Sequence, residues 1–186
     1  MSRSLGAPAA ALLLNTFAVT AALAQNPLPA ATARPAAEDC VPLDPAATPV
    51  AETGDWKLAA GSSAALDFGQ NGQDAKRAAD VIQHYHFTWE CFVRRPLAHM
   101  MYFKNGVAVP PGNMQGQDCI KLDPHAAEVA YVAGGWKVVD GQNWLLDYGA
   151  DRTAAQQSVA IIRNYSLNRE CFIARPHVLM QYWLSE

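Results

Sequence analysis

Aromatic, carboxylate and amide side chains surround one glycine in the second half of the sequence. Asp140 precedes Gly141, and Gln142, Asn143 and Trp144 follow it. A sugar ring stacks its C–H face on a tryptophan and donates or accepts hydrogen bonds through its hydroxyl groups, so these residue types together can bind a glycan. The sequence leaves open the alternative that Trp144 is a buried core residue beside a capped turn.

Carboxylates recur at equivalent places in the two halves of the sequence. They are Asp44 and Asp123, each followed by a proline, and Asp67 and Asp147, each two residues before a glycine. An Asp–Pro pair is typical of a turn in which the side chain accepts backbone N–H groups. Asp67 and Asp147 are each expected to accept a hydrogen bond from the turn that follows, or to pair with Arg95 and Arg175. A small hydrolase using Asp140 or Asp147 is the catalytic alternative, and it needs a second carboxylate about 5–10 Å away across a cleft.

No other catalytic or metal motif accompanies these residues. The sequence contains no G-x-S-x-G elbow, no H-E-x-x-H pair and no glycine-rich phosphate loop. His84 and His86 lie at the end of a predicted helix, where residues two apart point about 200° away from each other and form no two-ligand metal site. We therefore expect no enzymatic activity, no catalytic residue, no metal and no cofactor. The formal net charge of −3 also argues against a nucleic-acid partner.

The chain contains the same module twice. Equivalent segments are Asp39-Cys40-Val41 and Asp118-Cys119-Ile120, then Trp56 and Trp136, Glu90-Cys91-Phe92 and Glu170-Cys171-Phe172, and Tyr102 and Tyr182. We expect module 1 over residues 38–104, a linker over 105–116 that contains Pro110-Pro111-Gly112, and module 2 over 117–186. On this interpretation each module closes its own core, and residues 117–186 fold alone.

The four cysteines are divided equally between the modules, one near each start and one late in each. Pairing within a module gives Cys40–Cys91 and Cys119–Cys171, and it lets each module close independently. A small module buries a modest share of its surface, so a covalent link stabilises it where its core alone does not suffice.

The N-terminus has the pattern of an export signal. Arg3 is followed by an apolar stretch from Leu5 to Leu23, and Ala22-Leu23-Ala24 has the small residues of a cleavage site. We expect a signal peptide over residues 1–24, cleaved near Ala24, with an uncleaved membrane anchor as the alternative. Residues 25–37 are rich in alanine and proline and predict a flexible leader. The mature chain is expected to be secreted or periplasmic and to have no membrane span.

Both halves show the same succession of strand and helix patterns. In the second half three short β-type runs, at 129–132, 136–140 and 143–148, are separated by glycines. One helical face follows, at Ala155, Ser158, Val159, Ile162 and Tyr165, after Asp151 as N-cap. The first half has the same face at Ala75, Ala78, Ala79, Ile82 and Tyr85, after Asn71. The pattern predicts an α+β fold of two tandem β-β-β-α-β-β modules, each with one helix packed on a small antiparallel sheet.

The second module resembles a known kind of bacterial domain. The resemblance depends on Trp136-Lys137-Val138-Val139-Asp140-Gly141, on Trp144-Leu145-Leu146-Asp147-Tyr148-Gly149, on Cys171-Phe172-Ile173 with Arg175-Pro176, and on the final Tyr182-Trp183-Leu184. These segments are similar to a small disulfide-containing module that occurs, single or in tandem, in exported bacterial proteins. The first module departs from the pattern where Ala60 and Ala64 stand opposite Asp140 and Trp144. The resemblance implies export and the module boundaries, but no biochemical activity.

These observations favour a secreted, non-catalytic binding protein of two tandem modules, with cell-surface glycan as the ligand. Repetition supports this interpretation because two weak sites on one chain gain affinity through effective concentration. The alternatives are a structural or inhibitory module that contacts another exported or surface protein through exposed aromatic strands, and the small hydrolase described above.

Overall fold

The computed structural model describes residues 38–60, 63–95, 98–112 and 114–186, and contacts group these residues into one compact unit. The expected signal peptide over 1–24 and the leader over 25–37 lie outside the described residues. None of the described helices is long and apolar enough to cross a membrane.

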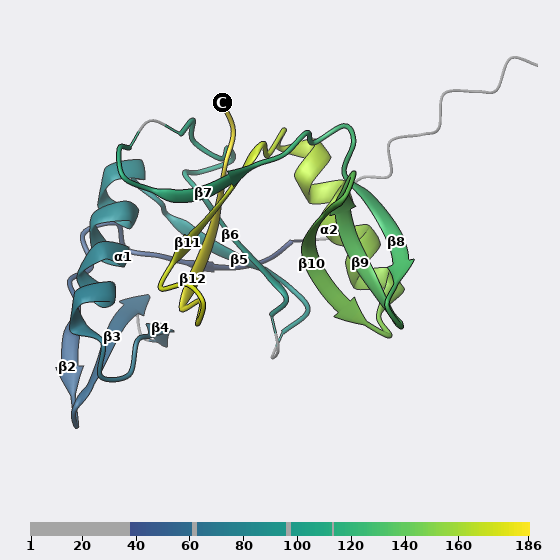
Figure 1. The fold of residues 1–186 in the computed structure, drawn as a ribbon. Helices are drawn as coiled ribbons and strands as arrows, with labels where there is room; N and C mark the ends of the chain where they lie inside the picture. The colour runs from purple at the N-terminus through teal and green to yellow at the C-terminus, as the bar shows by residue number, and fades with distance from the viewer. Residues whose placement is uncertain (1–37, 61–62, 96–97, 113) are drawn as a thin grey trace, which may run out of the picture. The chain divides into compact units, whose positions relative to one another are not determined.

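The two halves have the same order of elements (Figure 1). The first contains β1 (Asp39–Pro42), β2 (Val50–Glu52), β3 (Asp55–Ala60), β4 (Ser63–Asp67), α1 (Gly72–Tyr85), β5 (Trp89–Val93) and β6 (Met100–Lys104). The second contains β7 (Asp118–Lys121), β8 (Glu128–Val132), β9 (Gly135–Asp140), β10 (Asn143–Gly149), α2 (Arg152–Asn164), β11 (Arg169–Ile173) and β12 (Met180–Leu184).

The predicted α+β class with two β-β-β-α-β-β modules is wrong. The described chain is mostly β, with twelve strands in four three-stranded antiparallel sheets and two helices. The sheets have the strand orders β2-β3-β4, β8-β9-β10, β1-β5-β6 and β7-β11-β12. The prediction omitted β1 and β7, because each is four residues long and too short to show a strand period in the sequence.

Local sequence signals for the hairpins and helices agree with the structure. The three predicted runs of the second half coincide with β8, β9 and β10, which pair as two antiparallel hairpins. Each helix begins at its predicted cap: the Asn71 side chain accepts the Asp74 N–H at 3.2 Å, and the Asp151 side chain accepts the Ala154 N–H at 2.9 Å. A side-chain acceptor satisfies one of the N–H groups that have no partner within the helix, so it fixes where the helix starts.

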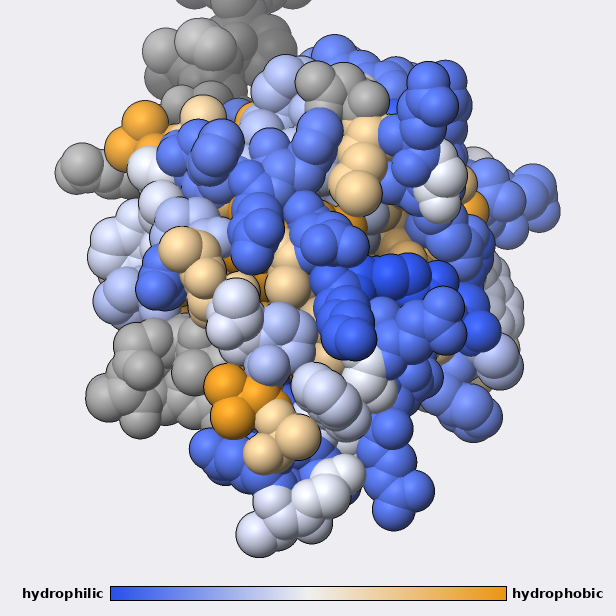
Figure 2. All heavy atoms as spheres, turned by 90° about the vertical axis from the view of Figure 1, so that its left-hand side faces the viewer, coloured by the Kyte–Doolittle hydropathy of each residue, from blue (hydrophilic) through white to orange (hydrophobic). Residues whose placement is uncertain are grey.

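Each helix is amphipathic, as its spacing predicted. The predicted face of α1 is fully buried, at Ala75, Ala78, Ala79, Ile82 and Tyr85. The predicted face of α2 is buried at Ala155, Ser158, Val159 and Ile162, but Tyr165 is the C-cap residue and is only half-buried. Figure 2 views the side of the molecule that carries α1 and the β2-β3-β4 sheet, and hydrophilic side chains dominate that surface.

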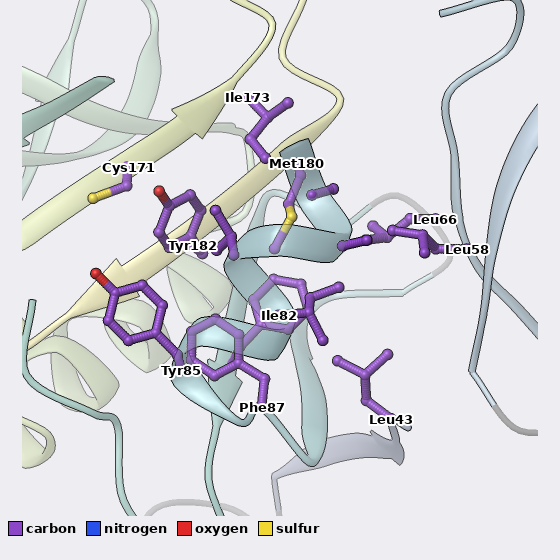
Figure 3. Close-up of a cluster of buried hydrophobic side chains, with 14 of the residues drawn as sticks. Leu43, Leu58, Leu66, Ile82, Tyr85, Phe87, Cys171, Ile173, Met180 and Tyr182 are labelled. Carbon is purple, nitrogen blue, oxygen red and sulfur yellow. The ribbon is translucent and has the colours of Figure 1, made fainter. Parts of the chain in front are cut away.

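The hydrophobic cores combine the two halves of the chain. In the first core, Leu58, Ile82 and other residues of β3, β4 and α1 pack against the second half. The residues that the second half supplies are Cys171, Ile173, Met180, Tyr182 and Leu184, from β11 and β12 (Figure 3). The sequence pattern identified which residues are buried, but not that strands of the other half cover them.

The second core is built in the same way, with the roles of the halves exchanged. Val138, Ile162 and other residues of β9, β10 and α2 pack against residues of the first half. The residues that the first half supplies are Cys91, Val93, Met100, Tyr102 and Val109. The two halves therefore exchange their β5-β6 and β11-β12 hairpins, and neither completes a core by itself.

Strands β6 and β12 lie side by side where the halves meet. There the Met101 N–H donates to the Gln181 Oε1 atom at 3.2 Å, which joins a backbone group of one half to a side chain of the other. Arg94 of the first half also pairs with Asp151, the cap of α2, at 3.2 Å. These polar contacts link the two halves.

Both predicted disulfides are present, Cys40–Cys91 and Cys119–Cys171. Each links the first strand of its half to the strand after the helix, with the two cysteines directly opposite in register. The disulfide thus lies within the β1-β5-β6 or β7-β11-β12 sheet and holds its edge strand in place.

Candidate binding site

The predicted glycan residues lie on the turn between β9 and β10. Asp140 pairs with Asn143 in register, and Gly141 between them has φ +58°, a left-handed conformation that favours glycine. Gln142 and Asn143 are exposed to solvent. Asp140 is half-buried, and its Oδ2 atom accepts the Asp123 N–H at 3.1 Å, so this oxygen holds the neighbouring turn.

Trp144 is a surface residue, with 57% of its area exposed. The register of β10 shifts between Trp144 and Leu146, so Leu146 is buried in the core while Trp144 projects outward. Of the two alternatives left open by the sequence, the structure supports a surface ring rather than a core ring.

A buried lysine lies beneath the Trp144 ring. The Lys137 Nζ atom is 4.5 Å from the ring centroid, and only 3% of the residue is exposed. A cation at this distance is attracted to the negative face of the indole, and the attraction is stronger where water is excluded. Lys137 thereby fixes the orientation of the ring and leaves the rest of the exposed indole free for a ligand. No local pattern in the sequence indicates this contact, because the two residues lie on neighbouring strands.

Lys137 is neutralised by Asp147, which lies opposite it in the β9-β10 register. The hydrogen bond from Lys137, together with that from the Gly149 N–H at 3.0 Å, holds the pKa of the Asp147 carboxyl below its usual range. Trp144, Lys137 and Asp147 thus form a continuous array on this sheet.

The recurrent aspartates occupy turns, as one of the two interpretations predicted. The Asp44 and Asp67 side chains accept N–H groups two residues further on, both at 2.9 Å. Asp123 and Asp147 make the equivalent bonds. The alternative pairing with the arginines is wrong, because Arg95 Nε donates to Asp39 and Arg175 Nε donates to Asp118, each at 2.6 Å.

A cavity of about 350 Å³ opens beside this array. Its walls combine the first half, at His99 and Met101, with residues of β10, β11 and β12. Asp147 is part of the wall, and its backbone oxygen lies 2.7 Å from the Nδ1 atom of His99. The cavity therefore exists only because the two halves are exchanged.

Glu170 lines this cavity and is the most unusual residue of the site. It is 1% exposed; its Oε1 atom accepts a hydrogen bond from Gln181 Nε2, and its Oε2 atom has no partner among the described residues. Burial raises the pKa of the Glu170 carboxyl to about 7. Glu170 is not among the candidates predicted from the sequence; the available signal was a charged residue repeated before a cysteine in both modules.

Glu90, the equivalent residue of the first half, is also buried. It is fully shielded from solvent, and neither carboxyl oxygen has a partner in the described part of the chain. Burial raises the pKa of Glu90 to about 8. Residue 101 is methionine where the second half has Gln181, so the two buried carboxyls have different surroundings.

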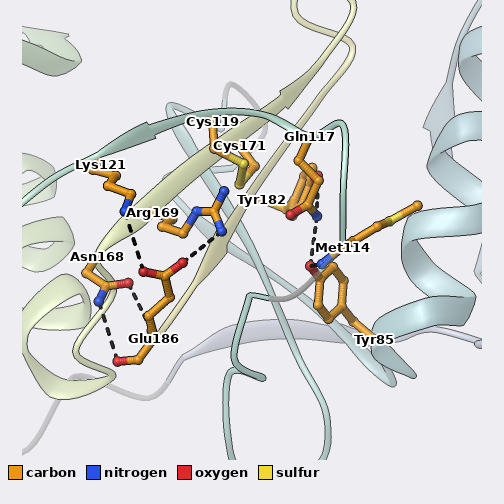
Figure 4. A network of polar contacts seen from close by, with 10 residues as sticks. All are labelled: Tyr85, Met114, Gln117, Cys119, Lys121, Asn168, Arg169, Cys171, Tyr182 and Glu186. Atoms are coloured by element: carbon orange, nitrogen blue, oxygen red, sulfur yellow. Dashed lines mark hydrogen bonds and ion pairs between the residues drawn. A yellow bond between two sulfur atoms is a disulfide. The ribbon is translucent and has the colours of Figure 1, made fainter.

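A smaller cavity of about 110 Å³ lies between α1, residues 114–118 and the β11-β12 hairpin. Gln117 Nε2 donates to the hydroxyls of Tyr85 at 2.8 Å and Tyr182 at 3.0 Å, as Figure 4 shows. Burial raises the pKa of Tyr182 to about 12. Gln117 therefore joins a helix of the first half to a strand of the second, and we assign it a structural role.

The His, Cys, Asp and Glu side chains of the described residues form no group that could hold a metal ion. No protein-family model, no curated protein and no solved structure matches the chain.

Proposed function

We propose that this protein is an exported, non-catalytic binding protein, and that Trp144 and its neighbouring turn bind cell-surface glycan. The observation that supports the proposal is the exposed Trp144 ring, held by Lys137 at the end of the turn that carries Asp140, Gln142 and Asn143. A sugar would stack on the free part of the ring and exchange hydrogen bonds with the carboxylate and amide groups. Because Lys137 already fixes the ring, little side-chain freedom is lost on binding.

Export is the second part of the proposal. The two disulfides are compatible with an extracellular or periplasmic location, where thiols oxidise. Cleavage of a signal peptide near Ala24 would deliver the chain there, and N-terminal sequencing of the exported protein tests this. We also retain the resemblance to exported bacterial modules as part of the proposal.

Substitution of Trp144 tests the binding site. Trp144→Ala should weaken binding to a glycan identified on an array by about 1–3 kcal/mol, while the melting temperature stays near that of the parent chain. Trp89→Ala removes another exposed tryptophan, from β5, and should leave glycan affinity unchanged. A large fall in melting temperature for Trp144→Ala, or equal glycan affinity in both variants, would contradict the proposed site.

A protein partner is the second candidate, favoured by an exposed aromatic on an edge strand. Tyr131 is 62% exposed and lies on β8, which has β9 as its neighbour on one side only. An edge strand can bind an extended segment through its backbone, with aromatic side chains adding contact area. Absence of binding to any glycan, by a chain that folds normally, would favour this candidate.

A further inference from the structure

The cavity beside the Trp144 array combines apolar walls with a buried acid. Met101, Leu145, Phe172 and Leu179 line it together with Glu170. Its volume of about 350 Å³ is within the range of small-molecule sites, which are mostly apolar with a few polar groups that orient the ligand. These features require a ligand with an apolar body and one polar head.

The hydrogen bonds around Glu170 determine what that head must be. The Gln181 amide oxygen is occupied by the Met101 N–H, so its NH₂ group faces the Glu170 carboxyl and donates to Oε1. Oε2 remains as an acceptor without a donor among the described residues. A buried acceptor without a partner is costly, and a ligand that supplies the donor removes that cost.

We propose that this cavity binds a small organic amine, with the ammonium group donating to Glu170 and the apolar body packing against Met101, Leu145 and Phe172. Gln181 is half-buried and lines the cavity together with Glu170. This site is independent of glycan binding by Trp144.

The charges around Glu170 favour an ammonium over a neutral or anionic head. A cation beside the ionised carboxylate forms a charge-assisted hydrogen bond and compensates for the burial of its charge. An anionic head would be repelled by the same carboxylate. The charge of Arg175 acts on Glu170, but Arg175 is already committed to Asp118 and stacks on Phe172 at 4.5 Å. The other titratable groups of the cavity are His99 and Asp147, and Lys137 neutralises Asp147.

Titration of the full chain with three matched probes tests the proposal. Calorimetry at pH 7.5 with benzylamine, benzyl alcohol and benzoate varies the head group while the apolar body is kept constant. Benzylamine should bind at least about tenfold more tightly than benzyl alcohol, as expected for a hydrogen bond to a charged group. Its affinity should rise between pH 5.5 and pH 7.5, because Glu170 loses its proton over this range.

Two isosteric variants locate the binding. Glu170→Gln should weaken the binding of benzylamine by about tenfold and remove the pH dependence of that affinity. The affinity for benzyl alcohol should stay unchanged. Glu90→Gln changes the equivalent buried acid of the other half, which does not line the cavity, and should leave all three affinities unchanged. Measurements on the parent chain alone can overturn the proposal. They do so if benzylamine and benzyl alcohol bind with equal affinity, or if benzylamine shows no saturable binding. A Glu170→Gln chain that keeps the amine affinity also overturns it.

Discussion

The substitution Glu90→Gln should change how the stability of the protein depends on pH. Glu90 is buried with no partner for its carboxyl among the described residues, and its pKa is raised from 4.5 to about 8. In the unfolded chain the carboxyl ionises near pH 4.5, whereas in the folded chain it keeps its proton until about pH 8. Its contribution to stability is therefore fully present below pH 4.5 and is lost as the pH rises through 8.

The size of the effect follows from the two pKa values. Between pH 5 and pH 8 this carboxyl should lower the free energy of unfolding by about 3.5 kcal/mol, because each pH unit well between the two pKa values changes that free energy by about 1.4 kcal/mol and the change levels off near each pKa. Glutamine has nearly the same shape and does not ionise, so Glu90→Gln should remove this loss. The acids with lowered pKa values, Asp118 and Asp147, act in the opposite sense and below about pH 4, which is outside this window.

Urea unfolding at pH 5, 6, 7 and 8, with the disulfides intact, measures the effect. The difference in unfolding free energy between pH 5 and pH 8 should be about 3.5 kcal/mol smaller in the variant than in the parent chain. Glu128→Gln, at an exposed position of β8, removes a carboxylate that water solvates in both states and should reproduce the parent pH dependence. An unchanged pH dependence in Glu90→Gln would refute the reasoning and mean that the carboxyl has a partner or water in solution.

Two further predictions concern the exchanged halves and the packing of a helix start. Residues 117–186 alone should give no folded monomer by light scattering and circular dichroism, because the second core needs β5 and β6 of the first half; a monomer with a cooperative melt would contradict the exchange. Gly72→Ala should destabilise the chain by about 1–3 kcal/mol in thermal unfolding, because a Cβ atom there would lie 2.5 Å from the Trp56 ring; an unchanged melting temperature would show that the ring moves aside.

The sequence predicted those features that depend on neighbouring residues. Capping by Asn71 and Asp151, the buried faces of the helices and the β8-β10 hairpins all follow from local spacing, and the structure contains them. The disulfide pairing also followed, because the repeat indicated which cysteines belong together.

The fold class and the cavity depend on long-range pairing, which periodicity does not encode. A buried position such as Tyr182 has the same pattern whether its own half or the other half covers it. Glu170 was missed for a related reason: a charged residue within a strand is normally assigned to the solvent face. Trp144 was ambiguous because the shift of register that turns it outward has no signature in the sequence.

The exchange of hairpins also determines when the two hydrophobic cores can be completed. Tyr182 and Leu184 complete the first core, and Trp183 completes the second, so neighbouring residues of the single strand β12 belong to different cores. A chain in which β12 has not yet docked therefore lacks a part of both cores. Contacts between residues so distant in sequence also form slowly. The architecture thus couples the two cores, because neither is complete before β12 is in place.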